Sequence, residues 1–292
     1  MLLKERIENT NYLSKAQKNV LDYMYEHPLE IKGMTLKEIS SKTYTSPATL
    51  VRLAKNLNYA GFEELREDFL KEQAYLTQNI HSINANLPFD SNDDYMKIAN
   101  KLTILNKETV DDTLSLLEYK NLSKAVEILN TSDQIHLTAI SFPLIHGYDF
   151  QLKMRKLGKQ VNIVDVLGEQ LYAEAVIHPN DCALLISYSG ETPLIREMIP
   201  VYKRKNIPII AITSIGDSSL RRNADVCLSI TTREKQYSKI AGFSNGTSIQ
   251  LLLDILYSCV FSKDYENNLK NKLELSKRSE PGRFASYDAI KE

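Results

Sequence analysis

The chain has 292 residues, of which 43% are hydrophobic and 25% are charged, with a formal net charge of −1. This is the composition of an ordinary globular protein, and the length favours two domains over one. No apolar run reaches the ~20 residues that cross a bilayer, and the charged N-terminus has no signal-peptide core, so we expect a cytoplasmic protein with no membrane partner.

The net charge and the cysteines narrow the possible functions further. Because the charge is close to zero, any DNA-binding surface must be local. The three cysteines lie in apolar stretches, far from one another and without the spacing of metal ligands; they are Cys182, Cys227 and Cys259. This usage predicts buried, reduced thiols, with no metal site and no cofactor.

The N-terminal segment, residues 13–69, is predicted to form a small helical domain. The residues Ser14–Gln17 read as a capping box that opens a first helix, and Thr35–Glu38 read as a second capping box that opens a short second helix. A third helix is predicted to start at Ser46, the N-cap, with Pro47 in the first helical position.

The third helix has two distinct faces when its residues are placed at 100° intervals. Two helices joined by a tight turn, the second exposing small, hydroxyl and basic side chains, have the geometry that reads a DNA major groove. The spacing alone also suits an ordinary three-helix bundle with a solvated face. The face predicted to pack inward holds Leu50, Leu53, Ala54 and Leu57, whereas the opposite face holds Ala48, Thr49, Arg52, Lys55 and Asn56.

Three segments of this region resemble one known family: Leu36–Ile39, Ser46–Leu53 and Leu57–Phe62. They are similar to the helix-turn-helix of the RpiR/MurR-type transcriptional regulators, in which this domain precedes a SIS (sugar isomerase) domain in the same chain. Two residues depart from the family pattern, because Tyr44 and Asn58 stand where the family usually has glycine. Asn tolerates a left-handed backbone well, and Tyr does so less readily.

The resemblance implies double-stranded operator DNA as a partner. Under this hypothesis the hydroxyl residues and the backbone at the start of the third helix hold phosphate, while the small and basic residues face bases or backbone. Arg52 has a structural alternative, an ion pair with Glu38 or Glu63. The DNA-binding candidates are Thr45, Ser46, Ala48, Thr49, Arg52 and Lys55.

The stretch that organises the second half of the chain begins with the continuously apolar residues Cys182–Ile186. Such a run suits a strand covered on both faces, as in a parallel sheet. A hydroxyl-rich turn follows at 187–192, and a helix is predicted from Pro193. Hydroxyls beside the N–H groups of a helix N-terminus favour a bound anion, usually phosphate. The alternative is that these hydroxyls only cap the helix.

The ordered features from residue 132 to 262 resemble the SIS domain. They are Ser-x-Ser-Gly-Glu-Thr after a strand, the strand at 207–213, and an Ala-Asp pair before the last strand at 226–230. The resemblance implies an α/β fold with a five-stranded parallel sheet flanked by helices, joined by a helical linker to the N-terminal all-α helix-turn-helix domain. We therefore expect a DNA-binding domain at 1–80, a linker and helical connector at 81–120, a SIS sugar-phosphate-binding domain at 121–263 and a polar C-terminal tail at 264–292.

The loop after the first predicted strand, residues 134–138, departs most from the family. The family usually has Gly-x-Gly-x-Ser there, whereas this chain has Ala139, Ser141 and Pro143 at those positions. Proline brings neither an N–H nor a hydroxyl, and Phe142 adds bulk that would narrow a pocket. Either Ser141 serves as the donor and the effector differs, or sugar-phosphate sensing has been lost. The ligand-binding candidates are Ser141, Ser187, Ser189, Gly190, Glu191 and Thr192.

The leading interpretation is a transcriptional regulator of carbohydrate metabolism that senses a phosphorylated sugar or amino-sugar derivative. The rival interpretations are a SIS-fold regulator that no longer senses such a ligand, and a phosphosugar isomerase. Isomerisation needs a base placed to move a proton between neighbouring carbons of the sugar. Glu191 is the only carboxylate in the hydroxyl-rich turn, and the sequence offers no recognisable partner for it, so we expect no catalytic residue. A homodimer is expected, with a homotetramer as the alternative.

Overall fold

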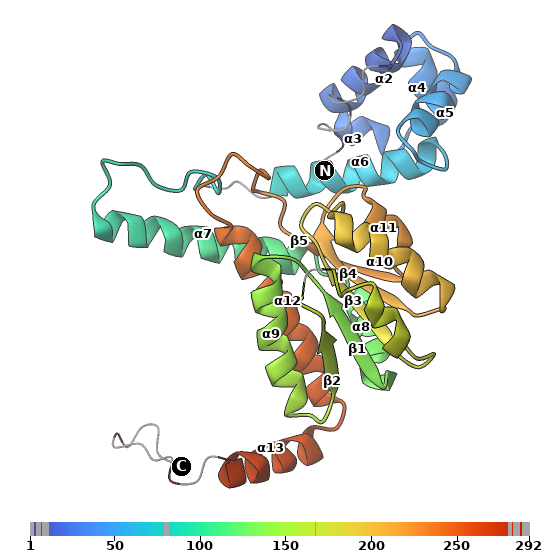
Figure 1. Ribbon diagram of the computed structural model, residues 1–292. Helices are drawn as coiled ribbons and strands as arrows, with labels where there is room; N and C mark the ends of the chain where they lie inside the picture. Colours follow the sequence, from blue (N-terminus) through green and yellow to red (C-terminus); the bar gives the residue numbers. More distant parts are fainter. Residues whose placement is uncertain are drawn as a thin grey trace. The chain divides into compact units, whose positions relative to one another are not determined.

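The computed structural model describes residues 12–78, 82–166 and 168–279, together with Leu3, Ile7, Gly282 and Tyr287 (Figure 1). The chain forms two compact units. The first comprises residues 1–84, 88–108 and 214–218, and the second comprises 85–87, 109–213 and 219–292. Most of the end of the predicted tail, residues 280–292, lies outside the described residues.

The first unit contains the predicted helical domain. Both capping boxes are present: the Ser14 and Thr35 side chains each accept from the backbone N–H three residues on. A one-turn helix that the sequence pattern did not predict follows the first of the three predicted helices. The helices are α2 (Lys15–Glu26), α3 (Pro28–Ile31), α4 (Leu36–Lys42), α5 (Pro47–Asn56) and α6 (Phe62–Gln78).

The apolar side chains of these helices form one core. It includes Val20 and Met24 of α2, Ile39 of α4, and Leu50 and Leu53 of α5, all fully buried. The face of α5 that was predicted to pack inward therefore does so. After α6 the chain continues to α7 (Tyr95–Ser115) and α8 (Tyr119–Thr131), which precede the sheet of the second unit.

The second unit is built on the predicted five-stranded, all-parallel sheet. The strands occur in the order β2-β1-β3-β4-β5, so the winding direction reverses between β1 and β3. In open α/β sheets, ligands bind outside the carboxyl ends of the strands at such a switch point. The strands are β1 (Gln134–Thr138), β2 (Gln160–Ile163), β3 (Cys182–Ile186), β4 (Ile209–Ser214) and β5 (Val226–Ile230).

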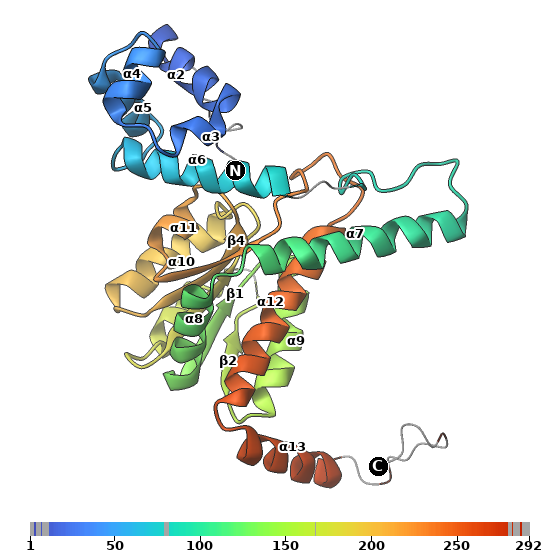
Figure 2. The same cartoon turned by 180° about the vertical axis from the view of Figure 1, so that it is seen from behind.

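Helices cover both faces of this sheet, which explains why β3 is buried at every residue. Cys182, Leu184 and Ile186 pack in one core with α8, α9 and α12, while Ala183 and Leu185 pack in another with α10 and α11. Helices α9 and α12 lie side by side (Figure 2). The remaining elements are α9 (Phe142–Arg155), a 3₁₀ turn (Tyr172–Val176), α10 (Pro193–Arg204), α11 (Ser219–Asn223), α12 (Phe243–Ser262) and α13 (Tyr265–Ser279).

The predicted polar tail begins with the helix α13, which the sequence pattern did not predict. None of its residues in the described part of the chain is buried. Its composition is dominated by Leu, Lys, Glu and Asn, and the first three of these are good helix formers. Among the described residues, no helix is long and apolar enough to cross a membrane, and no group of three metal-ligating side chains occurs.

Candidate functional sites

The outer face of α5 is presented by a well-formed helix start. The Ser46 Oγ accepts from the Thr49 backbone N–H at 3.3 Å and lies 3.0 Å from the Thr49 hydroxyl. Ser46, Ala48, Arg52 and Lys55 are exposed, and Thr49 is half-buried. Four of the six predicted DNA-binding residues are therefore exposed, and the remaining candidate, Thr45, is half-buried like Thr49.

The structural alternative for Arg52 is not observed. Its Nε donates to the Ala48 carbonyl oxygen at 3.3 Å, within its own helix. Glu38 instead accepts from the Thr35 backbone N–H at 2.7 Å, and Glu63 pairs with Arg66. Within the described part of the chain, the Arg52 guanidinium has no carboxylate partner and is free to meet an anion.

The hydroxyl turn, residues Ser187–Thr192, follows β3 at the carboxyl edge of the sheet. The Ser187 and Thr192 hydroxyls lie 2.7 Å apart, and the Ser187 Oγ also accepts from the Gly190 N–H at 3.1 Å. The Ser189 Oγ accepts from the Glu191 N–H at 3.2 Å. Although Thr192 is the N-cap of α10, its side chain makes no capping hydrogen bond. The hydroxyls therefore do not simply cap the helix, and the first-turn N–H groups of α10 receive no bond from Thr192.

Glu191 ties the hydroxyl turn to the next helix. Its carboxylate accepts from the Ser219 backbone N–H at 2.6 Å and from the Ser219 hydroxyl at 2.7 Å, at the start of α11. Arg196 lies 3.8 Å from the same carboxylate. This group is thus engaged in holding the turn, and no histidine contacts it in the described structure.

The loop after β1 has an unusual backbone at Ser141, with φ 60° and ψ −131°. This region is favoured by glycine, so the serine occupies a glycine-type conformation under strain. Helix α9 begins immediately afterwards at Phe142. The Phe142 ring packs edge-on against His146, with centroids 4.8 Å apart, and a Cβ at Gly246 of α12 would lie only 2.6 Å from it. Gly246 therefore makes room for the ring.

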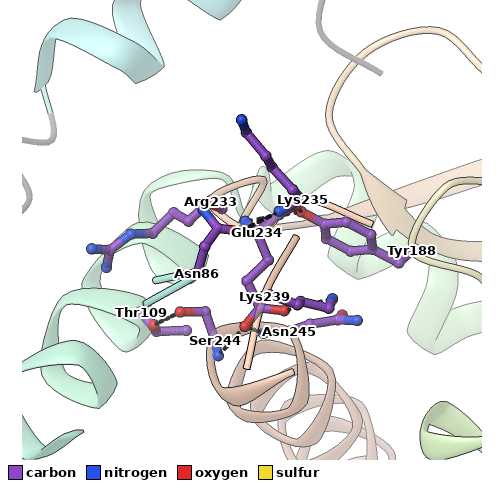
Figure 3. A network of polar contacts seen from close by, with 9 residues as sticks. All are labelled: Asn86, Thr109, Tyr188, Arg233, Glu234, Lys235, Lys239, Ser244 and Asn245. Carbon is purple, nitrogen blue, oxygen red and sulfur yellow. Dashed lines mark hydrogen bonds and ion pairs between the residues drawn. The ribbon is translucent and has the colours of Figure 1, made fainter. Parts of the chain in front are cut away.

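The segment between β5 and α12, here called the strap (Thr231–Gly242), is fastened by a buried carboxylate (Figure 3). The side chain of Glu234 is 1% exposed. One of its oxygens accepts from the Ser244 and Asn245 N–H groups at 2.6 and 3.1 Å, and the other lies 2.9 Å from the Lys239 ammonium. Glu234, which lies outside α12, thus accepts hydrogen bonds from first-turn N–H groups of this helix. Negative charge is favoured at this end of a helix.

The strap also contacts the hydroxyl turn through Tyr188. The Tyr188 hydroxyl donates to the Glu234 carbonyl oxygen and accepts from the Glu234 N–H at 3.2 Å. The Lys239 ammonium lies 5.2 Å from the centroid of the Tyr188 ring, a cation–π arrangement. Tyr188 therefore joins the hydroxyl turn to the strap.

Asn86 holds the strap from its other side. The Asn86 amide donates to the Arg233 carbonyl oxygen at 3.3 Å and accepts from the Lys235 N–H at 2.6 Å, and the Ile240 N–H donates to the Asn86 backbone carbonyl at 2.9 Å. Sequence reasoning missed Asn86, Tyr188 and Glu234. No local pattern signals contacts between residues separated by 46 and 147 positions.

Two family models match the chain. The model of the helix-turn-helix domain, rpiR family, matches residues 1–75, and the model of the SIS domain matches residues 128–258. The chain is 26% identical over 261 residues to the uncharacterized HTH-type transcriptional regulator TTE0211 of Caldanaerobacter subterraneus subsp. tengcongensis, covering 89% of this chain and 90% of that protein. It is 28% identical over 257 residues to the uncharacterized HTH-type transcriptional regulator YbbH of Bacillus subtilis, covering 87% and 88%.

Solved structures share the fold. The Vibrio vulnificus NanR protein, complexed with ManNAc-6P, is similar with a TM-score of 0.59 and 20% identity, over 97% of this chain and all of that chain. A putative sugar-phosphate isomerase from Listeria monocytogenes is similar with a TM-score of 0.56 and 17% identity, over 65% of this chain and all of that chain. The first likeness extends over nearly the whole chain, and the second over about two thirds of it.

Proposed function

This chain belongs to the RpiR-type helix-turn-helix transcriptional regulators that carry a SIS domain, and we propose that it controls carbohydrate-metabolism genes in response to a phosphorylated sugar or amino-sugar derivative. In this proposal the SIS domain occupies residues 121–263 and the DNA-binding domain residues 1–80. Effector binding at the first would change operator binding by the second, which requires that the effector favour one conformation of the protein over another.

The DNA-binding half of the proposal is supported by the exposed face of α5. Ser46 and Thr49 are placed at the helix N-terminus, where hydroxyls and N–H groups hold a backbone phosphate. Arg52 is exposed and unpaired by any carboxylate in the described structure, as a base-reading or phosphate-binding guanidinium must be. Ala48 and Lys55 complete the surface.

The effector half is carried by one observation: the hydroxyl turn lies at the switch point of the sheet and its hydroxyls do not cap α10. A phosphate monoester there would accept from Ser187, Ser189 and Thr192 and from the first N–H groups of α10. Ser141 at the end of β1 lies across the switch point and is the candidate donor to the sugar. Because NanR is complexed with ManNAc-6P, amino-sugar phosphates are the first compounds to test.

The rival functions have less support. For an isomerase, a base would have to face the sugar carbons, but Glu191 is engaged by Ser219, His136 is buried 2.9 Å from the Asp181 carboxylate, and His146 binds Gln250 at 2.7 Å. A regulator without a ligand is favoured only by Pro143, which removes a donor from the first loop. We therefore propose a regulator that senses a ligand and does not turn it over.

Isothermal titration with a panel of hexose, pentose and amino-sugar phosphates tests the effector half. At least one compound should bind the full-length protein, and Ser189→Ala should weaken it by about 10- to 100-fold, because a hydrogen bond to a charged group is lost. Ser262→Ala, an exposed serine at the end of α12, is the matched control and should bind normally. If no sugar phosphate binds, the ligand-free alternative holds, and conversion of any compound in a coupled assay would establish the enzyme instead.

Fluorescence anisotropy with an operator duplex tests the DNA half. The duplex is one selected from a random library by the wild-type protein. Arg52→Ala should weaken binding by about 10-fold or more and reduce the salt dependence of the affinity, whereas Arg155→Ala in the last turn of α9 should change neither. Unchanged affinity and salt dependence for Arg52→Ala would remove this residue from the interface.

A further inference from the structure

Among the described residues, four helices end in the same backbone geometry. In each, one residue adopts a positive φ, and the next residue donates its N–H to a carbonyl oxygen five positions back, at 2.8–3.1 Å. This is the Schellman-type helix end, whose left-handed position is usually glycine or asparagine. The left-handed residues are Tyr44 (φ 52°) after α4, Asn58 (φ 62°) after α5, Gly158 (φ 74°) after α9 and Asn206 (φ 56°) after α10.

Tyr44 is the exception among these four. Glycine has no Cβ to clash in this conformation, and the short Asn side chain is tolerated in it, whereas Tyr adopts it only under strain. The backbone leaves no freedom to relax: the Tyr44 N–H donates to the Ser41 carbonyl and the Thr45 N–H to the Ser40 carbonyl. The Thr43 hydroxyl adds a bond to the Ile39 carbonyl at 2.9 Å. Folding alone would therefore favour Gly or Asn at position 44.

The Tyr44 side chain does not stabilise the fold. It is 97% exposed, the highest exposure among the large exposed apolar side chains, and it has no partner in the described part of the chain. It stands in the turn between α4 and α5, two residues before the N-cap Ser46. A strained backbone therefore holds an aromatic side chain, without internal contacts, at the edge of the proposed DNA-binding face.

We propose that Tyr44 is a DNA-backbone contact: its ring packs on a deoxyribose beside the phosphate held at the start of α5, and its hydroxyl donates to a neighbouring phosphate oxygen. Tyrosine has only two side-chain rotations to fix, so it provides contact area at low entropic cost, and its hydroxyl is a recognised phosphate donor. This inference rests on the proposed DNA-binding function. Because the contact is to the backbone, Tyr44 positions α5 and does not read bases.

The test compares substitutions at two helix ends of the same geometry. Tyr44→Asn and Tyr44→Gly relieve the strain and remove the side chain, Tyr44→Phe removes only the hydroxyl, and Asn58→Gly is the control at the C-terminal end of α5. Binding of the full-length proteins to the selected operator duplex and to an unrelated duplex is measured by anisotropy, and folding by thermal melting.

We expect Tyr44→Asn and Tyr44→Gly to melt at or above the wild-type temperature and to bind both duplexes about 10-fold more weakly, while Tyr44→Phe loses about threefold. Asn58→Gly should bind within about twofold of wild type. The inference is overturned if Tyr44→Asn and Tyr44→Gly keep or improve the affinity, or if Asn58→Gly weakens binding as much as they do. Failure of this inference is distinguishable from failure of the proposed DNA binding, because the latter fails if the wild-type protein selects no duplex.

Discussion

The buried carboxylate of Glu234 gives the most quantitative prediction. The side chain is 1% exposed, accepts from two N–H groups at the start of α12, and pairs with Lys239, whose side chain is 18% exposed. Glu234→Ala leaves the helix start uncapped and the lysine without its counter-charge. Removing one partner of a buried ion pair costs about 3–5 kcal/mol of unfolding free energy, equivalent to a melting-temperature decrease of about 6–20 °C for a domain of this size.

A double-mutant cycle separates the ion pair from the rest of this loss. Once Glu234 is gone, Lys239 keeps only its cation–π contact with Tyr188, so adding Lys239→Met to Glu234→Ala should cost little further stability. We expect a coupling energy of about 1–3 kcal/mol, measured by calorimetry or by urea unfolding of all four proteins. Glu234→Gln keeps the shape of the side chain and should show an intermediate loss of unfolding free energy.

The control is an exposed carboxylate in the same unit. Glu266→Ala at the start of α13 should change the unfolding free energy by less than about 0.5 kcal/mol. If Glu234→Ala lowers the melting temperature by no more than this control, or if the cycle is additive within about 0.5 kcal/mol, the strap is not held by this pair and the reasoning fails.

Three further predictions concern a close packing contact, a buried thiol and the oligomeric state. Gly246→Ala places a Cβ against the Phe142 ring and should destabilise the protein by about 1–3 kcal/mol in urea unfolding, and Phe142→Leu in the same chain should restore most of the loss. Burial raises the pKa of the Cys182 thiol to about 11, so mass spectrometry should find it unlabelled by iodoacetamide at pH 8 until the protein is unfolded; labelling of the folded protein would contradict its burial. Light scattering should give the mass of the expected homodimer; a tetramer mass would favour the stated alternative, and a monomer mass would contradict both.

The features that sequence could predict are those with short-range causes. The capping boxes at Ser14 and Thr35 and the N-cap Ser46 depend on residues three apart, and they occur as expected. The apolar run Cys182–Ile186 predicted a strand buried on both faces, which the two layers of helices confirm. The left-handed backbone at Asn58 agrees with the tolerance of Asn for it, whereas Tyr44 was expected to adopt this conformation less readily and nevertheless does so, with φ 52°.

Other features depend on the assembled fold and have no local signature. The Tyr188–Glu234 contact joins a turn to a loop two strands later, and the Asn86 contacts reach across most of the chain. Helix α13 has too few apolar residues to produce a helical hydrophobic pattern, so it was expected to be only a tail. Glu191 was predicted to bind ligand, and only the fold shows that α11 engages its carboxylate.

The position of Asn86 limits where a truncated fragment of this protein can begin. Residues 85–87 belong to the SIS-containing unit, whereas the chain on either side of them belongs to the other unit. The α7 residues Thr109 and Thr113 likewise bind the buried hydroxyls of Ser244 and Ser248 at 3.0 and 2.7 Å. A truncated protein that begins at residue 121 would lack Asn86, Thr109 and Thr113, so their hydrogen-bond partners would be left without them, and it should be poorly soluble. One that begins just before Asn86 keeps them, and is the fragment to express when the sensor half is wanted alone for crystallisation or ligand screening.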